Sequence, residues 1–362
     1  MADTFPADAE DKAEPAPDAE QVAILAALAA ALPDPVIAVG TEDRVLVANS
    51  AARALFPALR ERALLQLAIR SPVVLDAIAT ARANNSGEKV CWLEKAPYDR
   101  LFDVHAAPVS SRDLPGIIVV TLKDLTEARR VERMRVDFVS NASHELRTPL
   151  ASLLGFIETL QGPARDDPHA RVRFLEIMRE QARRMARLVD DLLSLSRIEQ
   201  NEHLRPETPV DLAAIARHVA DTFGPVAAEA GVALQIDAPA EAIVPGDRDE
   251  LIRVAENLIE NAIKYGGSGA DPRVEVRVAL AGGNAVLTVR DHGPGIPPEH
   301  LPRLTERFYR VDAGQSRAKG GTGLGLAIVK HIMARHRGRL RIESEPGKGA
   351  SFIAAMPAWM AE

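Results

Sequence analysis

The sequence predicts a multidomain α+β protein, and three patterns along its 362 residues support this fold class. Residues 21–125 mix short alternating apolar stretches with helical patterns. Residues 126–205 hold two arms of about 30 residues each, whose apolar side chains recur every three or four positions. Residues 206–362 alternate helices with strands, which is typical of an α/β sandwich. A chain of this length has room for two or three domains of roughly 100 to 200 residues.

The composition narrows the class of protein. The net charge of −7 and the pI near 5.8 argue against a nucleic-acid-binding protein, whose domains are usually basic. A single cysteine, Cys91, excludes an internal disulfide and fits a reducing cytosol. The longest apolar run, Val22 to Leu32, is too short for a spanning helix, which needs about 20 residues. We therefore expect a cytoplasmic chain without a transmembrane segment, associated with a membrane only through a partner.

Residues 1–125 predict a tail followed by a domain of strands and helices. Residues 1–20 are acidic and rich in Pro and Ala, which predicts a disordered tail and not a signal peptide. Helical patterns run from Leu55 to Ala83. Alternating apolar residues predict strands at Val36 to Val39 and Val45 to Val47, joined by a turn at Thr41 to Asp43, and later at Lys89 to Leu93, Arg100 to Ala107 and Gly116 to Leu122.

Residues 126–205 predict a helical hairpin. Gly162 to Pro168 supplies the turn between the two arms. The apolar stripes include Met134, Phe138, Leu146, Leu150, Leu153 and Ile157 in the first arm, and Phe174, Ile177, Met185, Leu188, Leu192, Leu195 and Ile198 in the second. Two arms cannot bury such stripes on every side. Pairing of two hairpins into a four-helix bundle would bury them and predicts a homodimer; the alternative is a hairpin packed on its own domain.

A candidate nucleophile lies in the first arm, in FVSNASHELRTPL, residues 138–150. His144 and Thr148 are one helical turn apart and share a face, with Glu145 on their flank. Pro149 cannot donate to the carbonyl of Glu145, so we expect the helix to kink there. An exposed imidazole beside a carboxylate suits nucleophilic chemistry, although these residues alone also fit an ordinary solvated helix turn.

The C-terminal part predicts a mixed sheet with helices on one face. Pro206 to Pro209 forms a hinge, and Gly282-Gly283 a hairpin turn. Expected strands are Val232 to Ile236, Val274 to Leu280, Ala285 to Asp291, Arg339 to Glu343 and Ser351 to Met356. A helix capped by Asp247 carries Asn257, Asn261 and Lys264 on one polar stripe. Two amide oxygens with an ammonium one turn on suit Mg²⁺ shared with phosphates.

Two glycine-containing segments complete the candidate site. Asp291 ends a strand and precedes Gly293 and Gly295, which let the backbone approach a flat base while the carboxylate accepts from an exocyclic amine. Gly321, Gly323 and Gly325 open a helix at Leu326, where free N–H groups form an anion site for phosphates. The run lacks a GK[ST] ending, so a P-loop NTPase is rejected.

The segment around His144 resembles the phosphoacceptor box of bacterial sensor histidine kinases, and three further boxes follow in that family's order. They are ENLIENAIKYG (256–266), RDHGPGIP (290–297) and GGTGLGLAIVKHI (320–332), with ERFYRVD (306–312) before the last. Together they span roughly Arg129 to Pro357, and their wording resembles the phosphate-regulon sensor subgroup. The opening DPVIAVG…VANSAA and the closing LKDLTEARRVE of the first part resemble PAS sensor domains.

The resemblance implies a domain plan and a ligand set. It implies a PAS-like domain at 21–125, a dimerisation and phosphotransfer hairpin at 126–205, and at 206–362 the ATP-binding fold shared with gyrase, Hsp90 and MutL. It assigns Asn261 with Asn257 to Mg²⁺, Lys264 to phosphate and Tyr265 to packing on adenine. Asp291, Gly293 and Gly295 would read the base, and Gly321, Thr322, Gly323, Leu324 and Gly325 the phosphates. Residues 297–319, with Phe308, Arg310 and Arg317, would form a lid.

The implied function is an ATP-dependent, dimeric protein histidine kinase in a phosphate-responsive two-component system. His144 attacks the γ-phosphorus, Glu145 takes the proton, and the phosphoryl group passes to an aspartate of a response regulator. Thr148 is placed to orient water, which adds dephosphorylation of the regulator. The rival is a sensory docking module, which would lack His144, Asn261, Asp291 or the glycines. A mechanochemical ATPase would lack the histidine hairpin. The signal and any PAS ligand are left open.

Overall fold

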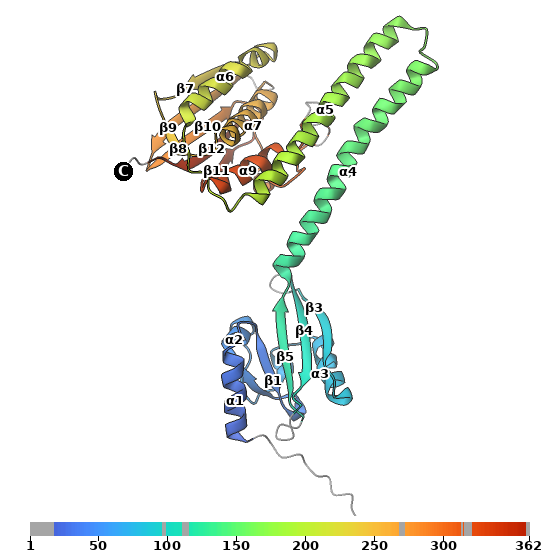
Figure 1. Ribbon diagram of the computed structural model, residues 1–362, viewed down its shortest axis with the longest axis vertical. Helices are drawn as coiled ribbons and strands as arrows, with labels where there is room; N and C mark the ends of the chain where they lie inside the picture. The colour runs from blue at the N-terminus through green and yellow to red at the C-terminus, as the bar shows by residue number, and fades with distance from the viewer. Residues whose placement is uncertain are drawn as a thin grey trace, which may run out of the picture. The chain divides into compact units, whose positions relative to one another are not determined.

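The computed structural model describes residues 18–95, 99–110, 116–267, 272–312, 314 and 321–359 (Figure 1). The chain divides into two compact units, Met1–Val136 and Asp137–Glu362, each described by itself. Most of the expected disordered tail lies outside the described residues. Its last residues, however, are helical, because α1 (Ala19–Ala30) begins where the Asp18 backbone N–H donates to Gln21 Oε1 at 3.0 Å. Such a cap stabilises a helix start.

The N-terminal unit contains a five-stranded antiparallel sheet in the order β2-β1-β5-β4-β3. Its strands are β1 (Val36–Val39), β2 (Val45–Ala48), β3 (Glu88–Glu94), β4 (Arg100–Pro108) and β5 (Ile118–Asp124). The other elements are the 3-10 turns Thr41–Asp43 and Leu65–Leu67 and the helices α2 (Ser50–Leu55) and α3 (Pro72–Asn84). All five predicted strands are confirmed to within two residues at each end. The helices follow the second strand, as the PAS resemblance implied.

The helical patterns expected from Leu55 to Ala83 are only partly confirmed. Helix α2 ends at Leu55, and the next α-helix begins only at Pro72. Two prolines explain the break. Pro57 disfavours the helical conformation at Phe56, which is extended in ψ, and Pro72 at the first helical position starts α3 afresh. The freed Phe56 ring turns into the core, where it stacks on Trp92 at a centroid distance of 5.8 Å.

One buried amide, Asn49, holds α1 against this sheet. Its Nδ2 donates to the carbonyl oxygens of Ala29 in α1 and of Asp34 after it, and its Oδ1 accepts from the backbone N–H groups of Val36 and Ala52. A buried carboxamide is stable only when its donors and acceptors are satisfied in this way. Asn49 is therefore a structural residue of the VANSAA segment.

The predicted hairpin is present as α4 (Thr126–Gln161) and α5 (Pro168–Gln200). The Asp167 side chain caps α5 by accepting from the backbone N–H groups of His169 and Ala170. Helix α4 runs through the buried Pro149 without a break, so the expected kink stays a prediction. From Asp137 onward α4 lies antiparallel to α5 (Figure 1).

The apolar stripes of the hairpin are only partly covered. Leu188, Leu195 and Ile198 of α5 are buried in the same core as the C-terminal lobe. Part of the second arm therefore packs on its own chain. This is the arrangement that we gave as the alternative to a dimer. Large apolar side chains of the hairpin that remain exposed include Val139, Leu150, Leu154, Ile157, Val172, Leu175, Val189 and Leu193.

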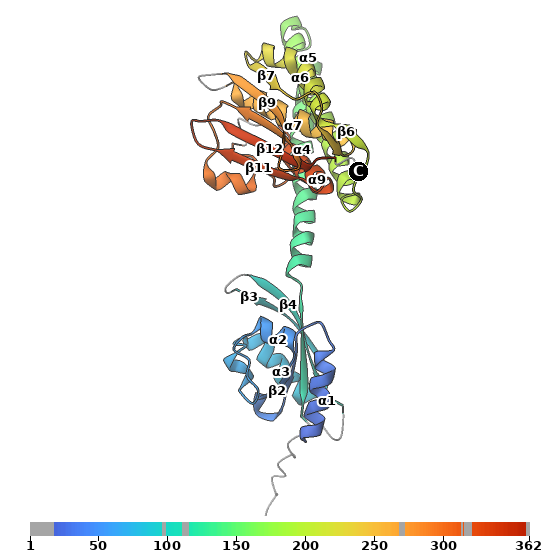
Figure 2. The same ribbon diagram turned by 90° about the vertical axis from the view of Figure 1, so that its left-hand side faces the viewer.

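The C-terminal lobe is the expected α/β sandwich. Its sheet has the order β11-β12-β10-β9-β7, and only the β7–β9 pair is parallel. The strands are β7 (Ala233–Asp237), β9 (Arg273–Ala281), β10 (Asn284–Asp291), β11 (Arg339–Ser344) and β12 (Ala350–Pro357). Helices α6 (Leu212–Glu229), α7 (Arg248–Gly266) and α9 (Gly325–Arg335) lie on one side of it (Figure 2). The sequence did not predict the small pair β6 (Pro209–Asp211) and β8 (Ile243–Pro245).

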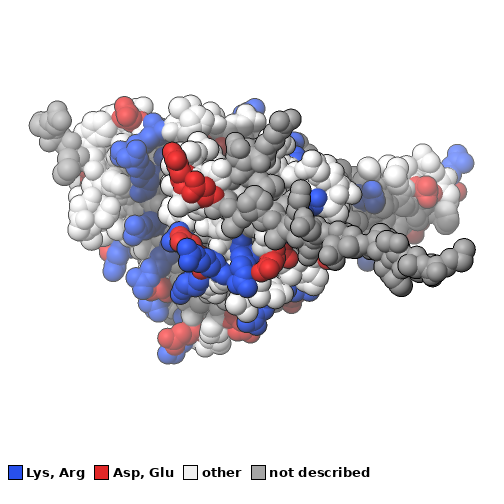
Figure 3. All heavy atoms as spheres, turned by 90° about the horizontal axis from the view of Figure 1, so that it is seen from below, with Lys and Arg blue, Asp and Glu red and all other residues white. Residues whose placement is uncertain are grey.

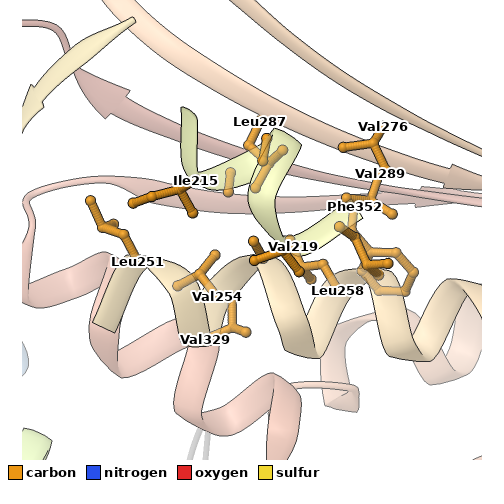
Figure 4. Packing of buried hydrophobic residues seen from close by; sticks show 14 of the residues in the cluster. Ile215, Val219, Leu251, Val254, Leu258, Val276, Leu287, Val289, Val329 and Phe352 are labelled. Atoms are coloured by element: carbon orange, nitrogen blue, oxygen red, sulfur yellow. The ribbon is translucent and has the colours of Figure 1, made fainter. Parts of the chain in front are cut away.

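The apolar face of α7 is the centre of the lobe's core. Figure 4 shows Leu251, Val254 and Leu258 of α7 beneath the sheet. The same figure labels Ile215 and Val219 from α6, Val329 from α9, and Val276, Leu287, Val289 and Phe352 from the strands. Each such side chain, when fully buried, contributes about 1.5–3 kcal/mol. This burial fixes the rotation of α7, and its polar stripe is left facing away from the sheet.

Two further features of the described residues are their lack of a membrane-spanning helix and the distribution of charge on one face. Among the described residues, no helix combines the length and the apolar content needed to cross a membrane. On the face drawn in Figure 3, Lys and Arg side chains lie among Asp and Glu side chains. Exposed ion pairs include Arg53 with Glu61, 2.8 Å apart.

Candidate nucleotide site and phosphoacceptor hairpin

A cavity of about 550 Å³ lies beside the polar stripe of α7. It collects most of the site residues expected from the sequence: Asn257, Asn261, Lys264, Tyr265, Asp291, Gly295, Gly321, Thr322, Gly323 and Gly325. Gly293 and the buried Leu324 lie in the same segments but do not line it. Residues far apart in the sequence thus form one concave site, as a small-molecule site requires.

Helix α7 carries the amide and ammonium groups of the cavity. Asn257 Nδ2 donates to the carbonyl of Arg253 at 2.8 Å, which leaves Oδ1 to face the start of α9. Asn261 lines the cavity one turn later. Lys264 Nζ lies 2.8 Å from Glu260 Oε1, so its charge is held beside the cavity. The set offers neutral oxygens and a cation, which suits Mg²⁺ and phosphate together.

The start of α7 is fixed by a residue that sequence reasoning missed. The Asp247 side chain accepts from the backbone N–H groups of Asp249 and Glu250, which confirms the predicted cap. The Asp247 backbone N–H in turn donates to Nε2 of the buried His336 at 3.0 Å. Nδ1 of His336 lies 2.8 Å from the Ile332 carbonyl, so the neutral ring carries its proton on Nδ1. Burial lowers the pKa of His336 and favours this neutral form.

Asp291 presents one carboxylate oxygen to the cavity from the end of β10. Its side chain is buried, and Oδ1 accepts from the backbone N–H groups of Gly293 at 2.9 Å and Ala350 at 3.3 Å. Burial raises the pKa of Asp291, and the two backbone hydrogen bonds oppose this shift. A desolvated, oriented oxygen acceptor is the group expected to read an exocyclic amine.

Glycines around Asp291 allow backbone segments to touch. Gly295 has φ = +73°, and a Cβ there would lie 2.1 Å from the Glu345 carbonyl oxygen. Gly349, which sequence reasoning missed, would place a Cβ 2.0 Å from the Asp291 carbonyl oxygen. Real Cβ atoms do not approach so closely, and both positions therefore require glycine. The Gly347-x-Gly349 spacing before the last strand was the signal that could have identified it.

The glycine run joins the cavity to α9. The helix begins at Gly325, one residue before the expected Leu326. A Cβ at Gly325 would lie only 2.3 Å from Asn257 Oδ1, so this glycine lets α9 and α7 meet at the cavity. Thr322 Oγ1 accepts from the Leu324 backbone N–H at 3.3 Å. Free N–H groups at this helix start suit a phosphate.

Part of the expected lid borders the cavity. Residues Pro298–Arg303 form a 3-10 helix, and Tyr309, Arg310, Val311 and Asp312 line the cavity. His300 Nδ1 lies 2.6 Å from the Tyr309 hydroxyl. The Phe308 ring packs against Phe138 of α4 at a centroid distance of 5.8 Å. Arg317 lies outside the described residues.

The structure separates the candidate phosphoacceptor from the cavity. His144 and Thr148 are exposed on α4, and neither is among the described residues that line the cavity. Thr148 Oγ1 donates to the His144 carbonyl at 3.1 Å. Glu145 is bound by two guanidiniums: Arg184 at 3.0 Å and both terminal nitrogens of Arg310 at 3.2 Å.

Helix α5 also borders the cavity, which sequence reasoning did not foresee. Arg187, Asp190 and Asp191 line it. Asp191 Oδ1 accepts from Arg253 at 2.8 Å, and Oδ2 accepts from the Thr322 hydroxyl at 2.7 Å. In the sequence these residues look like an ordinary polar helix face, and only the packing of α5 on the lobe brings them to the site.

Two family models match the chain in the order of these elements. Residues 134–201 match the His Kinase A (phospho-acceptor) domain, and residues 246–359 match the histidine kinase-, DNA gyrase B- and HSP90-like ATPase family. The chain belongs to the sensor histidine kinases. The predicted fold class, a phosphoacceptor hairpin joined to an ATPase-type α/β sandwich, is thereby confirmed.

Individual known proteins are also similar to this chain. It is 41% identical over 245 residues to the phosphate regulon sensor protein PhoR of Pseudomonas aeruginosa, covering 67% of this chain and 55% of PhoR. It is 40% identical to the sensor-like histidine kinase SenX3 of Mycolicibacterium smegmatis, covering 66% of this chain and 62% of SenX3. The solved Acinetobacter baumannii histidine kinase AdeS matches at 27% identity and a TM-score of 0.47, covering 59% of this chain and 97% of AdeS. The chain thus spans less than two thirds of either curated relative.

Proposed function

We propose that this chain is an ATP-dependent protein histidine kinase that phosphorylates His144. One observation carries the proposal: a single chain combines an exposed imidazole on the phosphoacceptor hairpin with a cavity lined by an oriented carboxylate, two amides and a glycine run. An ATPase without phosphotransfer does not need that histidine. A docking module without catalysis does not need the complete cavity.

In the proposed complex, the Asp291 oxygen that faces the cavity accepts from the adenine amine, and Tyr265 packs on the base. The phosphates lie toward Lys264 and the N–H groups of the glycine run, 321–325. Asn261 and Asn257 provide amide oxygens for Mg²⁺, and their donor chemistry fits a cation that otherwise keeps water and phosphate ligands. When bound, Mg²⁺ supplies charge neutralisation on the phosphates, which phosphoryl transfer requires.

The proposed reaction moves the γ-phosphoryl group from ATP to a ring nitrogen of His144. The bond between the γ-phosphorus and the bridging oxygen breaks, ADP leaves, and a nitrogen–phosphorus bond forms. The ring proton passes to Glu145. Because Glu145 is held by Arg184 and Arg310 in this conformation, the carboxylate has to exchange these partners for the imidazole. In-line placement of the two reactants then supplies most of the catalysis.

Incubation of the purified chain with γ-labelled ATP and Mg²⁺ tests the proposal. Label that stays on the protein in base and is lost in acid identifies a phosphoramidate. Chelation of Mg²⁺ with EDTA is the control and should prevent labelling. Absence of acid-labile label under conditions in which ATP binds would refute the kinase assignment.

Replacement of Asn261 by alanine should weaken binding of Mg-ATP by at least about tenfold, a loss that even outer-shell changes at metal sites produce. The effect should largely vanish when affinity is measured in EDTA, because the amide oxygen is proposed to act on the metal. Titration calorimetry with and without Mg²⁺ measures both values. Asn284→Ala, at the first residue of β10, is the matched control. An equal loss with and without Mg²⁺ would contradict the metal role.

The phosphoryl group is proposed to pass from His144 to an aspartate of a response-regulator protein. Thr148 is proposed to orient a water molecule that hydrolyses this aspartyl phosphate. Thr148→Ala should therefore spare autophosphorylation and slow dephosphorylation of the regulator. Thr159→Ala is a matched control, since its hydroxyl makes the same bond to the carbonyl four residues earlier on α4. Regulator phosphate is followed over time after removal of ATP. Equal loss of both activities would indicate a structural role.

Three further elements of the proposal concern assembly and signal. The exposed apolar side chains of the hairpin, such as Leu150, Leu154 and Leu193, support a homodimer in which two hairpins form a four-helix bundle. The N-terminal unit is proposed to be a PAS-type sensor. The likeness to PhoR supports a phosphate-responsive pathway. The domain limits at residues 125 and 205 and the cytoplasmic location belong to this proposal as well.

A further inference from the structure

One wall of the cavity is contributed by the phosphoacceptor hairpin, and it carries a carboxylate at the place proposed for phosphate. Asp191 of α5 is largely buried, with 17% of its side chain exposed. Its Oδ2 accepts from the Thr322 hydroxyl at 2.7 Å, within the glycine run that opens α9. Its Oδ1 accepts from Arg253 at 2.8 Å, and the same guanidinium donates to Ser194 Oγ at 2.5 Å.

A second carboxylate of the hairpin holds the other side of the same loop. Arg310 donates through both terminal nitrogens to Glu145 and through Nη2 to the Thr322 carbonyl at 2.8 Å. Thr322 is thus held at its hydroxyl by Asp191 and at its carbonyl by Arg310. A continuous chain of hydrogen bonds joins the neighbour of His144 to α5 through the glycine run.

We infer that Asp191 competes with the phosphates of the nucleotide for the glycine run, so that ATP binding releases the lobe from the hairpin. The inference rests on the proposed ATP binding at this cavity. It assigns to Asp191 a role in setting nucleotide affinity that is separate from the chemistry at His144.

The physical reason is that a negative charge fixed beside an anion site weakens that site for a second anion. A helix start with free N–H groups favours one negative charge. In this conformation the Asp191 carboxylate accepts from the Thr322 hydroxyl and so fixes a negative charge beside that helix start. A triphosphate arriving at the same loop would meet a fixed carboxylate in a half-buried cavity, where charges are screened less than at the surface. Binding therefore requires that the contacts of Asp191 with Thr322 and Arg253 open.

The same linkage predicts release of the lobe. Arg253 and Thr322 belong to the lobe, whereas Asp191 and Ser194 belong to α5. If nucleotide binding breaks the Asp191 contacts, then by reciprocity the docked arrangement lowers nucleotide affinity by the same factor. His144 is exposed but outside the cavity, so a freed lobe is also what the transfer step needs.

The test is Asp191→Asn in the full chain, with Mg-ATP affinity measured by titration calorimetry. The amide removes the charge, keeps the size, and still allows one hydrogen bond. We expect about tenfold tighter binding, within the range typical of coupled sites. Asp190→Asn is the matched control: it removes the same charge one residue away, from an exposed side chain that lines the cavity. It should change affinity far less.

A second measurement reports release of the lobe directly. Two fluorophores, one on α5 and one on the lobe, should show a distance change on ADP addition in the wild-type chain, and Asp191→Asn should show that changed distance before any nucleotide is added. Equal affinities of wild type and Asp191→Asn, or equal gains for both aspartate variants, would overturn the inference. If the wild-type chain binds no Mg-ATP at all, the proposed function itself fails instead.

Discussion

Replacing His144 with alanine should abolish acid-labile phosphate on the protein while leaving Mg-ATP affinity within about twofold of wild type, as for sites that share no partners. The imidazole is exposed on α4 and is not among the described residues lining the cavity. In the proposed function the His144 imidazole does not bind the nucleotide, but it is the group that receives the phosphoryl group. Labelling with γ-labelled ATP and titration calorimetry give the two values.

A second histidine of the same hairpin is the control for this variant. His169 is exposed at the start of α5, and His169→Ala should label like the wild-type chain. Circular dichroism should show the same helix content in both variants, because neither side chain is buried. Acid-labile phosphate on the His144→Ala protein would mean that another residue is the acceptor.

The fold was largely predictable because its periodic elements report directly on burial. The longer strands β4, β5, β9, β10 and β12 alternate buried with less buried residues, and α7 separates an apolar from a polar face, so pattern alone located them. The interruption at Pro57 was misread because the apolar residues Phe56, Leu59 and Leu65 continue into the core without a helix. The pair β6–β8 was missed since three-residue strands carry too little periodicity.

The lining of the cavity was predictable where residue type implies chemistry, and not where it depends on packing. The Asn257–Asn261 pair, Asp291 and the glycine run are unusual enough to stand out in sequence. His336 and Asp191 are not: one is a histidine near a helix end, the other an aspartate on a polar helix face. Their roles arise from approaches between residues 89 and 131 positions apart, which no local pattern encodes.

Asp291→Asn should weaken ATP binding by about 10- to 100-fold, the range expected when a buried polar group loses its partner. In the structure Oδ1 already accepts from the backbone N–H groups of Gly293 and Ala350. The new amide must therefore turn its NH₂ group either toward the cavity, against the adenine amine, or toward those two N–H groups. Either orientation brings donors together. Because an NH₂ facing the cavity can pair with the guanine carbonyl, the preference for ATP over GTP should fall.

The same variant should become more stable at neutral pH when no nucleotide is bound. Burial raises the pKa of Asp291 in the folded chain above its unfolded value. The folded state therefore binds the proton more tightly, and wild-type stability is lost as the pH rises through the two pKa values. An amide has no such ionisation, so its advantage should be small below about pH 4, the usual pKa of an aspartate, and grow toward pH 7. Urea unfolding of both proteins at pH 4 and pH 7 measures the difference. Two results together would contradict both roles of Asp291. They are a stability gain of Asp291→Asn that shrinks as the pH rises, and an unchanged affinity for ATP.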